Sequence, residues 1–193
     1  MMTEPVPTTH EPTPVASEER FRRQGLVVVN TGDGKGKTTA ALGVLLRAWG
    51  RGMKVVMVQF IKQSTSNYGE HRAARKLDIE LITMGGGFTW LSKDIERDKA
   101  LAREAWDVAK GKLAAEVYEV VVLDEITYPI TYGWIPIVEV LEALKGRPKH
   151  QHVIITGRKA DERLVEYADL VTEMREIKHP YKQGIKAQPG LDF

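Results

Sequence analysis

Cysteine is absent from this chain of 193 residues. Its absence excludes a disulfide framework, a thiolate metal site and a catalytic cysteine, and it fits a reducing cytoplasm. The sequence also lacks an apolar run long enough to span a bilayer, and its start has neither the basic residues nor the apolar stretch of a secretory signal. We therefore expect a cytoplasmic protein with no membrane partner.

An excess of charge of one sign is missing as well. The chain has 28 basic and 26 acidic side chains, which gives a formal net charge of +2. With this balance, bulk electrostatics does not favour binding to nucleic acid, so we expect no nucleic-acid partner. Hydrophobic residues make up 42% of the chain and charged residues 28%, a composition typical of a globular domain.

The start of the chain differs in composition from the rest. Residues 1–17 are rich in Pro, Thr and Glu and cannot bury enough apolar surface to fold alone, so we expect a disordered arm. Residues 18–24 favour a short helix, with Ser17 as its N-cap and acidic side chains in its first turn. Residues 25–193 are predicted to form a single domain.

Apolar runs and helical stripes alternate through this domain. Short apolar runs predict strands over 26–29, 55–60, 79–82, 120–123 and 152–156, and a weaker alternation predicts an edge strand over 170–174. Apolar residues at helical spacing predict a helix that ends at Gly50 or Gly52, and further helices over 94–115, 137–144 and 161–167. This order predicts an α/β fold with a mostly parallel sheet covered by helices on both faces.

A glycine-rich loop, residues 32–38, joins the first predicted strand to the first predicted helix. Its glycines permit backbone angles that let successive N–H groups point inward, and the helix N-terminus adds partial positive charge. Lys37 supplies a full charge for the terminal phosphates of a nucleoside triphosphate, and the Thr38 hydroxyl is a ligand for Mg²⁺. We therefore predict a triphosphate site within a P-loop NTPase-like three-layer fold.

One position of this loop departs from the usual spacing. Thr31 stands where such loops have their first glycine, and Gly32 is an additional glycine. The alternative interpretation is a chance glycine-rich turn. The flanking strand, the flanking helix and the adjacent Lys37 and Thr38 speak against that alternative.

Two carboxylates, Asp124 and Glu125, come directly after the apolar run 120–123. In nucleoside triphosphatases a carboxylate at such a position holds Mg²⁺, directly or through water, so we assign the metal to Asp124 together with Thr38. Glu125 has the place of a water-activating base in an ATP hydrolase. The alternative is that both carboxylates only cap the next turn.

Phe88 and Trp90 lie in a second glycine-rich loop, far from any apolar stripe. Their pattern favours equally a hydrophobic plug under the loop and a platform for a planar ligand. Arg47 lies on the first predicted helix. It either contacts a phosphate or, as is commoner for such an arginine, is a solvated or inter-helix residue. The histidines show no spacing suited to a metal site.

Six short strings together carry a resemblance to a known family: 31–39 (TGDGKGKTT), 58–62 (VQFIK), 87–90 (GFTW), 121–125 (VVLDE, followed by Thr127 and Tyr128), 153–158 (VIITGR) and 186–188 (KAQ). From residue 20 to residue 193 the chain resembles the P-loop family of ATP:corrinoid adenosyltransferases. The phosphate loop is shared by many families, whereas the GFTW and VQFIK strings are much more specific. Thr31 in place of a glycine is itself a feature of this family's loop.

The resemblance implies one reaction, in the biosynthesis or salvage of the adenosylated coenzyme form of vitamin B12. The reduced cobalt, Co(I), of a corrinoid attacks the 5′ carbon of ATP and gives an adenosyl–cobalt bond and free triphosphate. In the family's pattern, Arg47 contacts phosphate and Glu125 contacts the ribose, and the remaining ATP-binding positions are Thr31, Gly32, Asp33, Gly34, Lys35, Gly36, Lys37, Thr38 and Thr39. Lys37, with Mg²⁺ on Thr38 and Asp124, would stabilise the leaving triphosphate.

The resemblance also gives Phe88 and Trp90 a catalytic task beside Lys37 and Glu125. Their side chains exclude the axial ligand of Co(II), so that a flavoprotein such as a flavodoxin can reduce the four-coordinate cobalt. The resemblance further implies a homodimer in which residues 18–24 help to close the corrinoid site. Two alternatives remain open: an ATPase or kinase that cleaves at the γ-phosphate, and a nucleotide-dependent module that binds another protein or a nucleic acid.

Overall fold

The computed structural model describes residues 24–63, 68–87 and 94–192 of the chain. Its strands all pair in parallel and form a six-stranded sheet in the order β3-β2-β4-β5-β1-β6. The strands are β1 (Val27–Thr31), β2 (Val55–Gln63), β3 (Glu80–Gly85), β4 (Val120–Asp124), β5 (His152–Thr156) and β6 (Leu170–Glu173). The predicted α/β fold with a parallel sheet is confirmed, and β6 is an edge strand as expected.

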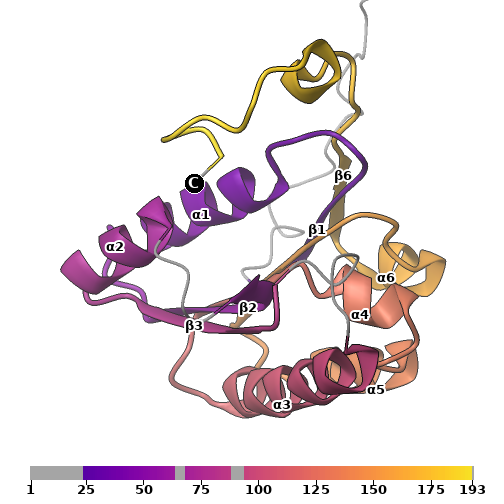
Figure 1. Ribbon diagram of the computed structural model, residues 1–193. Coiled ribbons are helices and arrows are strands. Elements are labelled where there is room, and N and C mark those ends of the chain that lie inside the picture. The colour runs from indigo at the N-terminus through magenta and orange to yellow at the C-terminus, as the bar shows by residue number, and fades with distance from the viewer. Residues whose placement is uncertain (1–23, 64–67, 88–93, 193) are drawn as a thin grey trace, which may run out of the picture.

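Helices cover both faces of this sheet, as Figure 1 shows. On one face lie α1 (Lys37–Trp49) and α2 (Gly69–Lys76). On the other face lie α3 (Ile95–Ala114), α4 (Thr127–Thr131), α5 (Ile137–Gly146) and α6 (Glu162–Tyr167). Within the described part of the chain, no helix is both long and apolar enough to cross a membrane.

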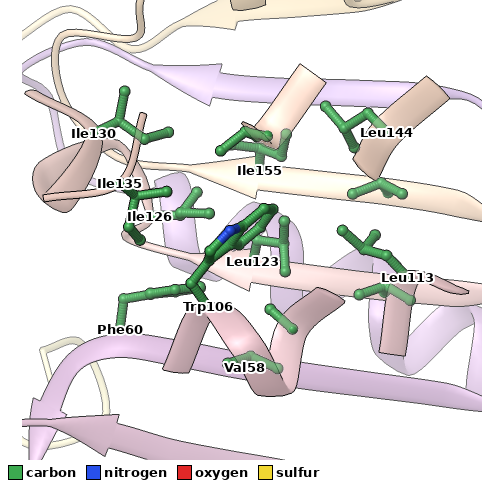
Figure 2. Close-up of a cluster of buried hydrophobic side chains, with 14 of the residues drawn as sticks. Val58, Phe60, Trp106, Leu113, Leu123, Ile126, Ile130, Ile135, Leu144 and Ile155 are labelled. Carbon is green, nitrogen blue, oxygen red and sulfur yellow. The ribbon is translucent and has the colours of Figure 1, made fainter. Parts of the chain in front are cut away.

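Trp106 lies at the centre of the larger apolar core, between α3 and the sheet (Figure 2). Its side chain is fully buried, and its ring nitrogen donates to Oε2 of Glu139 at 3.1 Å. The stripe predicted for this helix is buried as expected: Ala102, Ala105, Trp106, Ala109 and Leu113. Burial of one complete stripe fixes the face that α3 turns to the sheet.

The second apolar core lies between the sheet and the pair α1 and α2. Side chains alternate across a strand, so Val120 and Val122 of β4 belong to this core while Val121 and Leu123 belong to the larger one. The same alternation directs Asp124, the last residue of β4, to the α1 side of the sheet. Asp124 therefore lies at the end of the β4 face whose apolar residues pack against α1 and α2.

Three short elements were not predicted: α2, α4 and the 3-10 helix Pro180–Gln183. α2 is largely polar and buries only His71 and Ala74, so it carries no apolar stripe that would mark a helix. The predicted arm over 1–17 lies outside the described residues, and so does the predicted helix over 18–24 except for Gln24. The single domain over 25–193 stays a prediction.

Candidate active site

The glycine-rich loop starts where β1 ends, at Thr31, and leads into α1 at Lys37. Gly32 and Gly36 have φ angles of 93° and 110°, in the region that side chains disfavour. Gly36 is the N-cap residue of α1, so the unpaired N–H groups of the first helical turn face the loop. A helix N-terminus preceded by such a loop is a binding site for an anion.

A second segment, just after β6, packs against the back of this loop. The N–H of Gly34 donates to the Met174 carbonyl at 2.7 Å, and the N–H of Met174 donates to the Thr31 carbonyl at 2.8 Å. A Cβ atom on Gly32 would lie 2.5 Å from the Met174 carbonyl oxygen, and one on Gly34 would lie 2.8 Å from it. Both glycines are therefore required by packing against the chain itself, in addition to any role toward phosphate.

Lys37 bends back over the loop from the first turn of α1. Its ammonium group donates to the carbonyls of Gly32 at 2.7 Å and Gly34 at 2.6 Å. Burial lowers the pKa of Lys37 from its usual value of 10.5, and the nearby Arg158 guanidinium lowers it further. The Lys37 ammonium group is thus a partly desolvated cation held against the loop, where the phosphates of a nucleotide would lie.

Asp124 is fully buried and accepts hydrogen bonds from two hydroxyl groups. Thr38 Oγ1 donates to Oδ1 of Asp124 at 2.8 Å, and Thr156 Oγ1 donates to the same oxygen at 2.7 Å. These contacts join the first turn of α1 to the carboxyl ends of β4 and β5. A buried carboxylate is thereby positioned directly beside the phosphate loop.

This oxygen cluster suits a magnesium ion that also binds phosphates. Mg²⁺ prefers oxygen ligands and takes one or two from a protein, with phosphates and waters completing its shell. Thr38 and Asp124 supply such ligands within 2.8 Å of one another. Among the described residues no group of three or more His, Cys, Asp or Glu side chains could form an all-protein metal cage.

Glu125 has a strained backbone, with φ at 64° although it is not a glycine. Such a residue costs about 1–3 kcal/mol and commonly marks a functional position. Its N–H is held by Thr156 Oγ1 at 2.9 Å. Burial, together with the adjacent Asp124 charge, raises the pKa of Glu125 to about 7. The site therefore contains a partly desolvated carboxyl group beside the buried Asp124.

The sequence matches a known family over almost its whole described length. A model of the family described as ATP:corrinoid adenosyltransferase BtuR/CobO/CobP matches residues 23–193. This chain belongs to that family. Its sheet, its phosphate loop and the carboxylates after β4 all fall within the matched region.

Curated relatives carry the same description. The chain is 46% identical over 178 residues to the corrinoid adenosyltransferase of Escherichia coli (strain K12). These aligned residues are 92% of this chain and 88% of the relative. It is 44% identical to the corrinoid adenosyltransferase CobA of Salmonella typhimurium, with the same coverage. It is also 44% identical to the corrinoid adenosyltransferase of Pseudomonas aeruginosa, over 88% of this chain and 84% of the relative.

The structure does not bring every expected site residue into contact with the cluster of Lys37, Thr38 and Asp124. Arg47 is exposed in the last turn of α1, and with a rise of 1.5 Å per residue its backbone is roughly 15 Å from that of Lys37. Thr39 is exposed in the first turn, and the Lys35 side chain pairs with Asp192 in the C-terminal segment. Phe88 and Trp90 lie outside the described residues. For these positions the expected roles stay predictions.

Four residues that the structure brings to the candidate site were not singled out from the sequence: Thr156, described above, and Arg158, Gln59 and Lys62. Arg158, just after β5, lies 3.9 Å from the Asp33 carboxylate at the loop. Gln59 donates to Asp124, and Lys62 lies 3.9 Å from the same carboxylate. Gln59 and Lys62 are polar residues within the otherwise apolar strand β2, and that interruption was the available signal.

Proposed function

We propose that this chain transfers the 5′-deoxyadenosyl group of ATP to the Co(I) centre of a corrinoid and releases triphosphate, in the biosynthesis or salvage of adenosylcobalamin. The observation that carries this proposal is the family match over residues 23–193, which contains the complete phosphate loop and the carboxylates beyond β4. The cobalt electron pair forms the bond to C5′ of ATP. The C5′–O bond breaks, and its electron pair leaves with the triphosphate.

The loop then serves a leaving group. Charge develops on the triphosphate as the C5′–O bond breaks, and preorganised donors are most effective where charge develops. Lys37 and the first-turn N–H groups of α1 would provide those donors. The Lys37 ammonium group is already held at the loop by the Gly32 and Gly34 carbonyls. Mg²⁺ held by Thr38 and Asp124 would neutralise part of the triphosphate charge.

Glu125 has a different task in this proposal from the one it would have in a hydrolase. We assign it to the ribose of ATP, because a carboxyl group can hold a sugar hydroxyl without activating any water. Its backbone is fixed by Thr156, the residue that also binds Asp124. The nucleoside and the triphosphate would then be positioned from one hydrogen-bonded cluster.

The corrinoid side of the reaction rests on residues outside those described. We propose that Phe88 and Trp90 keep the axial ligand off Co(II), that a flavoprotein such as a flavodoxin reduces the four-coordinate cobalt, and that two copies of the chain form a homodimer. Residues 18–24 would help to close the corrinoid site. A cytoplasmic location completes the proposal, and cell fractionation would test it.

One assay separates this function from its alternatives. The protein is incubated with ATP, Mg²⁺ and a chemically reduced corrinoid, and the phosphorus-containing products are resolved. We expect triphosphate that forms only when corrinoid is present. ADP and phosphate without corrinoid would instead establish an ATPase, and ATP binding without any turnover would establish a nucleotide-dependent binding module.

A further inference from the structure

Gln59 lies beside the proposed metal carboxylate, in the middle of the sheet. β2 and β4 are neighbours, and their register sets Gln59 directly opposite Asp124. Strand alternation places the Gln59 side chain on the same face as Val55 and Met57, which pack under α1 and α2. The amide is completely buried. A fully buried amide at this place has no access to solvent and must be satisfied by the protein.

Its two hydrogen bonds give the amide a direction. Nε2 of Gln59 donates to Oδ2 of Asp124 at 3.0 Å, and Oε1 of Gln59 lies 2.7 Å from Nε2 of His71. An ionised carboxylate only accepts hydrogen bonds, so the amide must turn its NH₂ group to Asp124. Its carbonyl then faces His71, whose Nε2 must carry a hydrogen. The result is a directional chain from α2 through β2 to Asp124.

Lys62 shows what this chain of hydrogen bonds prevents. Its ammonium group is paired with Glu70 at 2.5 Å and lies 3.9 Å from Oδ2 of Asp124, the oxygen that Gln59 occupies. Lys62 and Oδ2 already form a long ion pair at 3.9 Å, and without the Gln59 donor the ammonium group could move into hydrogen-bond contact with that oxygen. A carboxylate neutralised by a lysine attracts a divalent cation less strongly.

We propose that Gln59 and His71 are positioning residues for magnesium binding by Asp124. Gln59 donates to Oδ2, keeps Lys62 from moving closer than its 3.9 Å ion pair with that oxygen, and leaves Oδ1 directed to Thr38. His71 holds the Gln59 amide in the required orientation. This inference rests on the proposed role of Asp124, and it couples the metal site to α2, which the adenosyl transfer does not otherwise involve.

The test measures metal-dependent ATP binding without corrinoid. ATP affinity is measured by calorimetry with Mg²⁺ and with a chelator, and the ratio of the two affinities is the magnesium effect. Partners of metal ligands commonly change metal affinity by roughly 10- to 100-fold, so we expect Gln59→Leu and His71→Phe to reduce the magnesium effect by about 10-fold or more. Metal-free ATP affinity should stay within about 2-fold of the parent, because the proposed effect of both residues on ATP runs through Asp124 and its metal.

A rescue variant and a matched control make the result specific. A glutamine can present an N–H where histidine has Nε2, so His71→Gln should restore most of the magnesium effect that His71→Phe loses. Lys76→Ala, at an exposed position of the same helix, should leave it unchanged. The unfolding midpoint of each variant shows that it is folded. His71→Phe keeps the test decisive if Gln59→Leu does not fold.

Asp124→Asn separates this inference from the function on which it rests. If Asp124→Asn abolishes the magnesium effect while folded Gln59→Leu and His71→Phe retain it, the positioning role is wrong and the metal role of Asp124 stands. If Asp124→Asn also retains the effect, the metal role itself is wrong. Equal ratios for His71→Gln and His71→Phe would likewise overturn the proposed orientation by His71.

Discussion

The Thr38 hydroxyl donates to Oδ1 of Asp124 at 2.8 Å, although the two residues are 86 positions apart in the chain. This contact joins the phosphate loop to the end of β4. Both oxygens belong to residue types that bind Mg²⁺. The pair therefore joins the part of the site that we propose holds phosphate to the part that we propose holds the metal.

Thr38→Val should weaken the response to magnesium. Valine keeps the shape of threonine but removes the hydroxyl, and a hydrogen bond to a charged group contributes about 1.5–3 kcal/mol. We expect the magnesium concentration for half-maximal triphosphate release to rise by about 10-fold or more. Thr38→Ser, which keeps the hydroxyl, is the matched control. Equal magnesium requirements for the two variants would count against Thr38 as a metal ligand.

Lys37→Ala should slow adenosyl transfer strongly. The ammonium group lies over the phosphate loop, and removing one preorganised donor to developing charge commonly costs roughly 100-fold or more in rate. The rate is measured with pre-reduced corrinoid under saturating ATP. Lys54→Ala removes the same charge just before β2, at the amino ends of the strands and so opposite the phosphate loop. This variant should leave the rate unchanged. Near-parental turnover by Lys37→Ala would refute its role toward the leaving triphosphate.

Trp90→Ala should affect one form of the corrinoid more than the other. Exclusion of an axial ligand is needed to reduce Co(II) but not to use cobalt that is already Co(I). We therefore expect a much larger loss when a flavoprotein supplies electrons to Co(II) than when the corrinoid is chemically reduced beforehand. Both rates are followed by the absorbance of the adenosylated product. Equal losses in the two assays would contradict the ligand-exclusion role.

Gly157 is a position at which we expect an alanine to damage the fold. Its φ is 142°, and a Cβ atom there would lie 1.9 Å from Thr127 Oγ1. That hydroxyl donates to the Arg158 carbonyl at 2.7 Å, so the clash would displace the turn after β5. Overpacking and backbone strain together should lower the free energy of unfolding of Gly157→Ala by about 2–4 kcal/mol in urea titrations.

Two variants separate the clash at Gly157 from backbone strain alone. Gly133 also has a positive φ, 71°, but no described atom within 4 Å of its Cβ position. Gly133→Ala should therefore cost only about 1 kcal/mol. Adding Thr127→Ala to Gly157→Ala removes the clashing hydroxyl, so the double variant should lose less stability than the sum of the single losses. Strictly additive losses would show that the contact is not responsible.

The fold was predictable because its signals are local. Buried parallel strands appear in the sequence as short apolar runs, and α3 is indicated by a complete stripe of apolar residues at helical spacing that ends at Leu113. The polar helix α2 gives no such signal, since only His71 and Ala74 of its residues are buried. Its position is set by contacts with the sheet, which periodicity does not report.

The site was predictable only where its residues adjoin a recognisable motif. Thr38 and Asp124 each follow from a strand and its loop, and the general pattern of nucleoside triphosphatases assigns them jointly to a metal. Gln59 and Arg158 come to the site through strand register and a turn. Both lie in strings that resemble the family, and Gln59 interrupts an apolar strand, but neither signal indicates which side chains they contact. Arg47 lies about 15 Å along the helix axis from Lys37, and its expected contact with phosphate stays a prediction.

Glu125 should make the stability of the ligand-free protein depend on pH. Burial and the Asp124 charge raise its pKa from 4.5 to about 7. Because the folded state then binds the proton more tightly than the unfolded state does, the free energy of unfolding falls as the pH rises through this range. The penalty is absent below about pH 4.5, grows between the two pKa values, and is complete above about pH 7.

Glu125→Gln removes this titration and should therefore stabilise the protein only where Glu125 is ionised. We expect a gain of about 1–3 kcal/mol in the free energy of unfolding at roughly pH 8, and almost none at roughly pH 4. The measurement is urea unfolding across this range, with a chelator present and nucleotide absent. Glu166→Gln, an exposed position on α6, should give no such difference. Removing a buried charge can stabilise the protein only at pH values where that charge exists. An equal gain for Glu125→Gln at both pH values would therefore mean that burial does not destabilise the ionised carboxyl group.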